Sequence, residues 1–217
     1  MPFSRPDEPG VTALAQQWQS LAGRDDLSQE LIASVFVTIS DHYSAKDRAY
    51  HKLSHITALL ELAASFEDQF QNYDAVRFAI WFHDVIYYPR QADNEEQSAE
   101  FAADALSRLS IPAAMIASVR EMILATKGHS PAQASADLKL FLDLDLAILG
   151  APEESYRAYS AAIRQEYAWV PEFIYRRERR KILDSFLRRE ALYQTRPMIT
   201  KYEAQARRNI ADELASL

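Results

Sequence analysis

The segment Phe78-Ala79-Ile80-Trp81-Phe82-His83-Asp84-Val85-Ile86-Tyr87-Tyr88 determines how the rest of this chain is interpreted. It is apolar on every side and shows no alternation with a period of two, so we predict a buried helix rather than a strand. His83 and Asp84 lie next to each other within it. A carboxylate in an apolar helix is costly unless it is paired, and adjacent helix positions diverge by about 100°. Two explanations stay open: a shared cation outside the helix, or one salt-bridged aspartate and one hydrogen-bonded histidine.

Composition places the chain among ordinary globular proteins. Its 217 residues are 48% apolar and 25% charged, which suffices for one sizeable core. The small number of glycines, 4, favours long helices with few tight turns. Because cysteine is absent, disulfides and thiolate metal ligands are excluded, and any metal site must use histidine, aspartate or glutamate.

The distribution of charge and apolar residues predicts a cytoplasmic protein without a membrane partner. Residues 1–10 are polar and proline-rich, which predicts a loose arm without a signal region. No apolar run approaches the length needed to span a bilayer. The net charge of −7 argues against general nucleic-acid binding.

Helical signals recur along the whole chain, and no segment has a clear strand pattern. We therefore predict an all-α protein of nine or ten helices. It would be one domain over residues 1–217, with a core bundle at about 28–150 and a C-terminal helical layer at about 151–217. Predicted helix starts include a cap at Ser28, a start at Asn72 or Asp74, and a capping box formed by Asp93 and Glu96. The predicted helices occupy residues 11–22, 29–43, 54–66, about 74–88, 93–109, 112–127, 138–149, 152–169, 173–189 and 197–217.

Three stretches place metal-binding groups in otherwise apolar helices. They are residues 51–56, with His51 and His55, then His83-Asp84, and then residues 140–149, which contain two aspartates. One histidine, a histidine-aspartate pair and one further aspartate make a suitable set of two nitrogen and two oxygen ligands. Such a set suits Mn, Fe, Zn, Ni or Co better than Ca.

The order H…HD…D on consecutive helices resembles the HD-domain superfamily of metal-dependent phosphohydrolases. His55 resembles the first ligand of that family, because it begins the pattern His-Ile-x-x-Leu-Leu-x-Leu-Ala at a helix start. His83 and Asp84 match the doublet. Asp145 matches the final aspartate, with Asp143 as its rival. The motif core covers roughly residues 51–150.

Three further stretches resemble a poorly characterised bacterial subgroup that is predicted to consist of HD phosphohydrolases. They are residues 50–56, 93–99 and 163–167. The resemblance implies an HD-type helical bundle and one divalent metal ion, which would be Mn, Fe, Ni, Zn or Co, with Mg as a further candidate. Many relatives hold a second metal with extra histidines between the doublet and the last aspartate. Here that interval contains only His129, which does not favour a full second site.

The resemblance implies hydrolysis of a phosphoester. The cation would bind a phosphoryl oxygen, lower the pKa of a bound water and neutralise developing charge. Asp84 would both bind the metal and orient the attacking water. Lys127 and His129 would reach phosphate oxygens in the functional interpretation, whereas in the structural one Lys127 only complements a helix dipole.

Four other residues are candidates for substrate binding, and each has a structural alternative. His51 lies four residues before His55, so it shares a helix face with it or belongs to the preceding loop. Glu96 is either a water-positioning base or a first-turn acid and cap. Arg164 would bind phosphate bidentately, with Tyr167 in the same pocket, or these residues would pair locally with Glu166.

A basic cluster from Arg176 to Lys181 is expected to be a solvated helix face, although such a run can also attract a polyanionic substrate. The leading hypothesis is a metal-dependent phosphohydrolase of a small phosphorylated metabolite, with nucleotides among the candidates. The alternative is a module that keeps the metal and binds or senses a nucleotide with weak catalysis. A third hypothesis, an iron oxygenase on the same scaffold, needs more ligands than the sequence supplies. The sequence permits a homodimer but does not require one.

Overall fold

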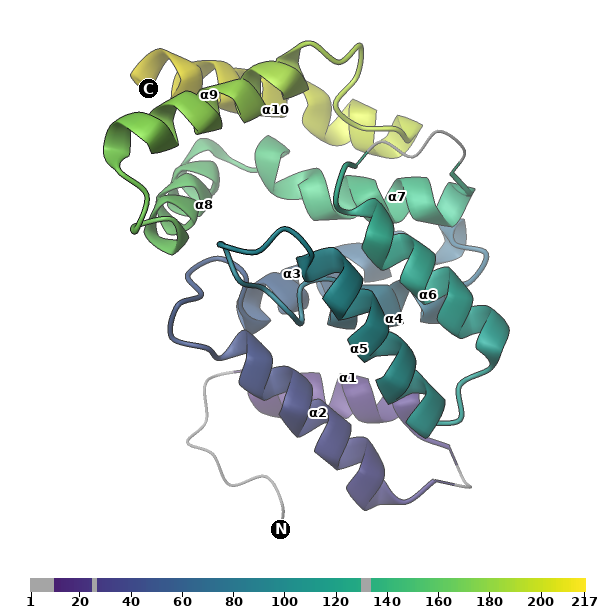
Figure 1. Cartoon of the computed structure of the whole chain (residues 1–217). Helices are drawn as coiled ribbons and strands as arrows, with labels where there is room; N and C mark the ends of the chain where they lie inside the picture. Colours follow the sequence, from purple (N-terminus) through teal and green to yellow (C-terminus); the bar gives the residue numbers. More distant parts are fainter. Residues whose placement is uncertain (1–9, 25–26, 130–133) are drawn as a thin grey trace. The chain divides into compact units, whose positions relative to one another are not determined.

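The computed structural model describes residues 10–24, 27–129 and 134–217 (Figure 1). Within these ranges the chain forms ten α-helices and two 3-10 helices, with no strand, which confirms the all-α prediction. The arm is predicted at residues 1–10, and residues 1–9 of it lie outside the described residues. The elements are α1 (Val11–Ala22), α2 (Gln29–Tyr43), α3 (Leu53–Ala64), η1 (Glu67–Gln69), α4 (Tyr73–Phe82), α5 (Asn94–Arg108), α6 (Ala113–Ala125), α7 (Ala136–Asp145), η2 (Leu146–Gly150), α8 (Glu153–Glu166), α9 (Glu172–Leu187) and α10 (Arg196–Ser216).

The described residues divide into two compact units. The first lies within residues 1–45 and 51–130 and contains α1 to α6, and the second lies within residues 46–50 and 131–217 and contains α7 to α10. The predicted core at about 28–150 therefore includes parts of both units. The short segment 46–50 belongs to the second unit, although its neighbours in the sequence belong to the first.

The first unit is built around α4, which packs against α3, α5 and α6 (Figure 1). Asn72 caps this helix by accepting a hydrogen bond from the backbone N–H of Ala75, as predicted. On α1, the indole of Trp18 lies edge-on to Trp81 of α4, with ring centroids 5.6 Å apart. The Trp18 Nε1–H donates to the carbonyl of Ile32 at 3.0 Å, which joins α1 to α2. Apolar burial and one satisfied indole thus hold the unit together.

The central helix is shorter than the sequence predicts. It ends at Phe82, whereas the prediction carries it to about Tyr88. The hydroxyl of Ser98 on α5 accepts from the N–H of Ile86 and donates to its carbonyl, both at 3.1 Å. The side chain of Asn94 bonds the N–H and the carbonyl of Tyr88, both at 3.0 Å. These side chains replace the helical partners of the backbone, so the helix cannot continue.

The predicted capping box at the start of α5 is wrong. In the described structure Asp93 makes no side-chain cap hydrogen bond. Glu96, which would turn back to Asp93 in a capping box, instead accepts a hydrogen bond from Lys127. The carboxylate of Glu96 is therefore bound in a salt bridge with Lys127.

The second unit brings α10 against η2, α7 and α9, while α8 packs on η2. Gly150 permits this approach, because a Cβ at its position would lie 2.7 Å from the Cβ of Tyr202. The buried amide of Asn209 on α10 donates to the carbonyls of Leu149 and Ala151, both at 2.8 Å. The end of η2 is thus held by backbone contact and by one buried side chain.

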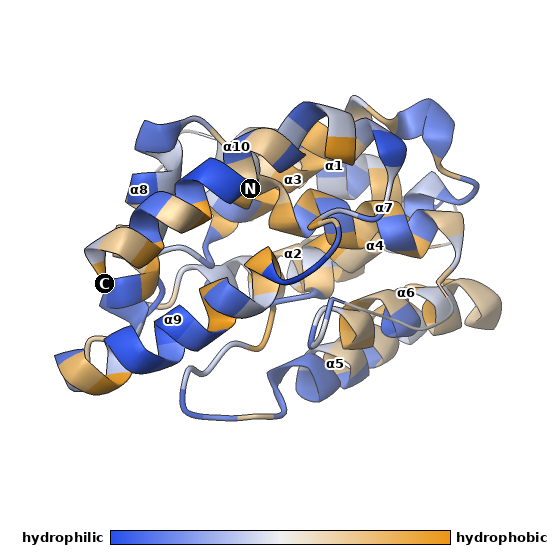
Figure 2. Ribbon diagram, turned by 90° about the horizontal axis from the view of Figure 1, so that it is seen from above, coloured by the Kyte–Doolittle hydropathy of each residue, from blue (hydrophilic) through white to orange (hydrophobic). Residues whose placement is uncertain are grey.

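The basic cluster on α9 contains one residue that is not solvated. Arg176, Arg177, Arg180 and Lys181 are exposed as expected, and Figure 2 shows α9 as largely hydrophilic. Arg179 is 7% exposed, and its Nε and Nη2 donate to the two carboxylate oxygens of Glu213 at 2.8 and 3.0 Å. The hydroxyl of Tyr156 also bonds Glu213. A buried bidentate pair therefore joins α9 to α10.

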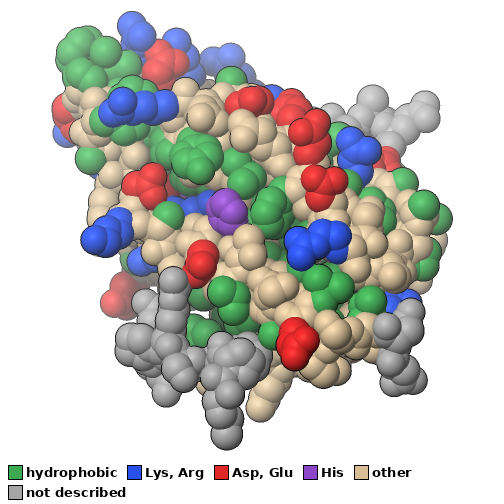
Figure 3. Space-filling view, turned by 60° about the horizontal axis from the view of Figure 1, so that its bottom comes forward, with side chains coloured by type: hydrophobic (Ala, Val, Ile, Leu, Met, Phe, Trp, Pro, Cys, Tyr) green, Lys and Arg blue, Asp and Glu red, His purple; other side chains and the backbone are tan. Residues whose placement is uncertain are grey.

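Charged side chains on the exposed surface are mixed in sign. On the face shown in Figure 3, acidic and basic side chains are interspersed among hydrophobic ones.

None of the described helices is both long and apolar enough to cross a membrane.

Replacing Glu213 tests the buried pair. Glu213→Gln would leave the guanidinium of Arg179 buried without a carboxylate, so we expect the free energy of unfolding to fall by about 3–5 kcal/mol. Urea denaturation followed by circular dichroism measures this change. Arg180→Gln is the matched control on the exposed face and should change stability by less than about 0.5 kcal/mol.

The same pair predicts a pH dependence. Burial raises the pKa of the Glu213 carboxyl, but the hydrogen bonds and charge of Arg179, together with hydrogen bonds from Tyr156 and Ser160, hold the pKa below its usual value of 4.5. Because the folded-state pKa is the lower one, ionised Glu213 stabilises the fold above its unfolded pKa, and this contribution is lost as the pH falls through the folded pKa. The stability difference between wild type and Glu213→Gln should therefore shrink on acidification, and a difference that stays constant would contradict the assignment.

Candidate metal centre

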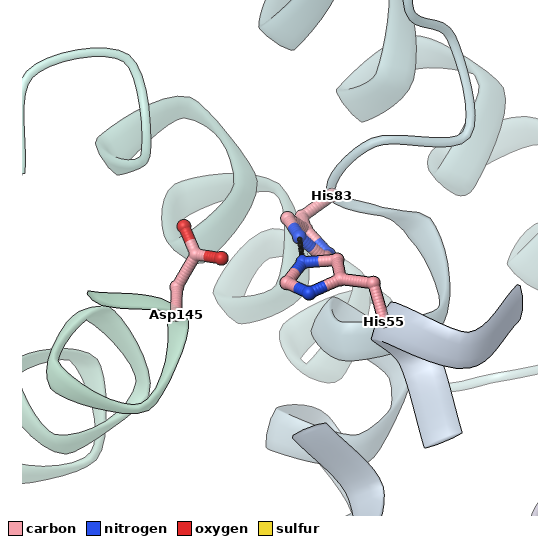
Figure 4. A group of neighbouring side chains, drawn as sticks. All are labelled: His55, His83 and Asp145. Carbon is pink, nitrogen blue, oxygen red and sulfur yellow. Dashed lines mark hydrogen bonds between the residues drawn. The ribbon is translucent and has the colours of Figure 1, made fainter. Parts of the chain in front are cut away.

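Two buried histidines of the first unit form the core of the site. His55 lies in the first turn of α3 and is 6% exposed, and His83 follows the last residue of α4 and is 1% exposed. Their Nε2 atoms are 3.2 Å apart, and Figure 4 shows the rings turned toward each other. The Nδ1 of His83 bonds the carbonyl of Ile80 at 2.9 Å. Since a carbonyl only accepts, Nδ1 carries the proton and Nε2 of the neutral ring keeps its lone pair, as in a metal-binding histidine.

Asp84 is the third residue of this unit whose side chain places a potential metal-ligand atom at the site. Its Oδ2 lies 3.0 Å from Nε2 of His83 and 4.0 Å from Nε2 of His55. Two ligand atoms that are each about 2.1 Å from one ion lie about 3.0–3.4 Å apart at angles of roughly 90–110°. Two of the three separations are close to this range, and the third corresponds to a wider angle. The geometry is therefore suitable for a divalent cation that is bound by nitrogen and oxygen.

The contact between His83 and Asp84 corrects the argument from helical geometry. Adjacent helix positions diverge, which predicts that these two side chains cannot meet. They do meet, since Nε2 of His83 lies 3.0 Å from Oδ2 of Asp84, and the pair directly follows Phe82, the last residue of α4.

His51 lies beside this group, in the loop before α3 rather than on the helix face. Its Nε2 is 3.8 Å from Oδ2 of Asp84. Its ring packs on Tyr87 with centroids 4.1 Å apart and planes 31° from parallel. Sequence reasoning missed Tyr87 because it counts only as one more apolar residue in the segment 78–88. Ser98 and Asn94 bond the backbone of Ile86 and Tyr88, the residues on either side of Tyr87. Two residues of the segment 93–99 therefore have a structural role next to the site.

Lys127 and Glu96, two of the predicted site residues, form a salt bridge with each other. The ammonium of Lys127 donates to Oε1 of Glu96 at 2.5 Å and to the carbonyl of Ala92 at 2.6 Å. The bond from Lys127 holds the pKa of the Glu96 carboxyl below its usual value. Lys127 thus joins the segment after α6 to the first turn of α5 through Glu96 and to the loop before α5 through Ala92. Roles in catalysis for Lys127 and in substrate binding for Glu96 stay predictions.

His129 follows α6 and adopts a left-handed backbone conformation, with φ of 48°. The sequence predicts a helix to about Lys127, but α6 ends at Ala125. His129 is the last residue before an interval that the structure does not describe, and its catalytic role stays a prediction.

The two aspartates of the second unit have different surroundings. Asp143 is buried, and its oxygens accept from the N–H groups of Gln194 and Thr195 at 2.7 Å and from the hydroxyl of Thr195 at 2.6 Å. Burial raises the pKa of the Asp143 carboxyl, while these donors oppose the shift. Asp145 is the last residue of α7, is partly exposed and is drawn in Figure 4. His55 and His83 of the first unit and Asp145 of the second unit are residues of types that can each offer a metal ion one ligand atom. Asp143 is committed to the backbone, so Asp145 is the better match to the last predicted ligand.

Arg164 makes local bonds, but its carboxylate partner is Glu172 rather than the Glu166 of the structural alternative. Its guanidinium donates to Glu172 at 2.9 Å, to the carbonyl of Tyr167 at 2.7 Å and to that of Val170 at 3.1 Å. It also lies over the ring of Tyr175 at 4.6 Å. Arg164 thus caps the C-terminal end of α8, and phosphate binding by Arg164 and Tyr167 stays a prediction.

Comparison with known proteins adds no relative. No protein-family model matches the chain, and neither a curated protein nor a solved structure matches it. The interpretation of the site therefore rests on its residues and their geometry.

Ser98 supplies a test of how the segment after Asp84 is held. Ser98→Ala removes both bonds to the backbone of Ile86, and because Ser98 is 0% exposed, water cannot replace them without rearrangement. We expect the free energy of unfolding to fall by about 1–3 kcal/mol in urea denaturation. Ser118→Ala is the matched control, since Ser118 is a partly exposed serine that bonds the carbonyl of Ala114 one turn earlier in α6. Equal effects of the two substitutions would contradict this role for Ser98.

Proposed function

We propose that this protein is a metal-dependent phosphohydrolase that cleaves the phosphoester of a small phosphorylated metabolite. The observation that carries the proposal is the group of His55, His83 and Asp84, whose donor atoms lie 3.0 to 4.0 Å apart. Asp145 is the proposed fourth ligand, on the strength of the H…HD…D pattern. His51 is proposed to contact the substrate or its water, since it lies beside Asp84 in the first unit.

The ligand set limits the identity of the ion. Imidazole nitrogens and carboxylate oxygens suit Mn, Fe, Zn, Ni or Co, and no thiolate competes because the chain has no cysteine. When bound, such an ion supplies Lewis acidity toward a phosphoryl oxygen and lowers the pKa of a coordinated water. The ion identity and the substrate, for which nucleotides are candidates, are part of the proposal.

His83 and Asp84 differ in their exposure to solvent, and this difference suggests different roles for the two ligands. His83 is buried and is oriented by the carbonyl of Ile80, so it is suited to fix the position of the cation. The side chain of Asp84 is 20% exposed, so it is the ligand that water and substrate can reach. This difference supports Asp84 as the group that orients the attacking water.

A second candidate function is a module that binds a metal and a nucleotide but turns it over slowly. The observation that favours it is that two residues predicted to bind phosphate are bonded to other groups of the protein. Lys127 is bonded to Glu96, and Arg164 is bonded to Glu172 and to two carbonyls. Nucleotide binding without turnover across several metals would support this candidate over the hydrolase.

Metal analysis of purified variants tests the proposed centre. We expect about one divalent ion per chain in the wild type after reconstitution with Mn, Fe, Ni or Zn, and loss of most of it in His83→Ala and Asp84→Ala. His42→Gln is the matched control, because His42 belongs to α2 and packs on Phe101. Asp145→Ala tests the fourth ligand separately. A wild type that holds no ion under any of these conditions would contradict the proposal.

Activity distinguishes the two candidates. The hydrolase should release phosphate from p-nitrophenyl phosphate or from a nucleotide only when the metal is present, and Asp84→Ala should reduce the rate by at least about 10²-fold. Phosphate release that survives chelation of the metal would contradict a role for the centre in catalysis.

A further inference from the structure

A buried carboxylate of the second unit holds the backbone immediately before His51. Glu166 is the last residue of α8 and is 5% exposed. Its Oε1 accepts hydrogen bonds from the backbone N–H groups of Ala49 and Tyr50, both at 2.8 Å. A carboxylate that accepts two consecutive N–H groups of one loop segment fixes the path of that segment.

A second contact from the same helix fixes the same segment. The ring of Tyr50 meets that of Tyr159 edge-on, with centroids 4.7 Å apart. Tyr159 and Glu166 are seven residues apart on α8 and therefore share one helix face. Tyr159 in turn lies under the guanidinium of Arg179, 5.5 Å from its ring centroid, and Arg179 is bound to Glu213. The face that holds segment 46–50 is thus backed by a buried ion pair.

The start of α3 depends on the residues that precede it. Lys52 occupies the N-cap position of α3, and within the described chain it makes no side-chain cap hydrogen bond. Helix starts are usually fixed by such a bond. The chain passes from the anchored Tyr50 through His51 and Lys52 to His55 in five further residues. The anchor on residues 49 and 50 therefore takes over part of the role of the missing cap.

We infer that Glu166 is a positioning residue for the metal centre, which acts through the backbone of Ala49 and Tyr50 on His51 and His55. The inference rests on the proposed function, since it concerns the affinity of the same centre. Segment 46–50 belongs to the second unit, and His51 and His55 belong to the first. The peptide bond between Tyr50 and His51 joins the anchored segment to the residues of the proposed centre. The ring of His51, which packs on Tyr87, is held independently within the first unit.

The affinity for Zn²⁺ or Mn²⁺ tests this inference, measured on the full-length chain by competition with a chromogenic chelator. Glu166→Ala removes both acceptor bonds, and we expect the dissociation constant to rise by about 10–100-fold, as for other groups that orient metal ligands. Glu166→Gln keeps a neutral acceptor oxygen and should have an intermediate dissociation constant. Glu154→Ala, at an exposed glutamate in the first turn of α8, is the matched control and should bind as the wild type does.

The outcomes separate positioning from a purely structural role. Circular dichroism and the urea midpoint of the metal-free proteins identify which variants are folded, and dissociation constants are compared only among those. If Glu166→Ala does not fold, Glu166→Gln carries the test alone. A folded Glu166 variant with the dissociation constant of the wild type would overturn the inference, even if its urea midpoint is lower. A wild type that binds neither ion would overturn the proposed function and, with it, this inference.

Discussion

The capture of the backbone after Phe82 by two side chains of α5 is the constraint on which the site depends. Ser98 and Asn94 bond the N–H and carbonyl groups of Ile86 and Tyr88, so α4 stops before these residues. Directly after the last residue of α4, Nε2 of His83 and Oδ2 of Asp84 lie 3.0 Å apart. A serine and an asparagine thus fix the segment that follows this pair.

Buried polar groups elsewhere in the chain follow the same principle. In the second unit, Asp143 accepts from the backbone of residues 194 and 195, Asn209 donates to the carbonyls at the end of η2, and Glu166 accepts from residues 49 and 50. Each of these side chains fixes a turn or loop that has no regular hydrogen-bond ladder of its own. In an all-helical protein with few glycines, such bonds place the connections between helices.

The proposed chemistry is consistent with this division of roles. His83 is oriented by the carbonyl of Ile80 and is almost fully buried, whereas Asp84 is partly exposed beside it. A rigid ligand next to an accessible one is the arrangement that a hydrolytic metal centre requires, because the ion must stay in place while water and substrate exchange. Lys127, which the sequence placed at the phosphate, instead forms a salt bridge with Glu96 in the same unit.

The sequence by itself determined the fold class and the group of candidate ligands. The helical periodicity of apolar residues is a local property, and therefore most helices lie close to their predicted ranges. His55, His83 and Asp84 could be identified because each is a polar group in an apolar surrounding, which demands a partner. Only the tertiary structure decided where α4 ends, that Tyr87 packs on His51, and that Asp143 is bound to the backbone of residues 194 and 195. These outcomes depend on hydrogen bonds and ring contacts between residues up to 52 positions apart, which no local pattern encodes.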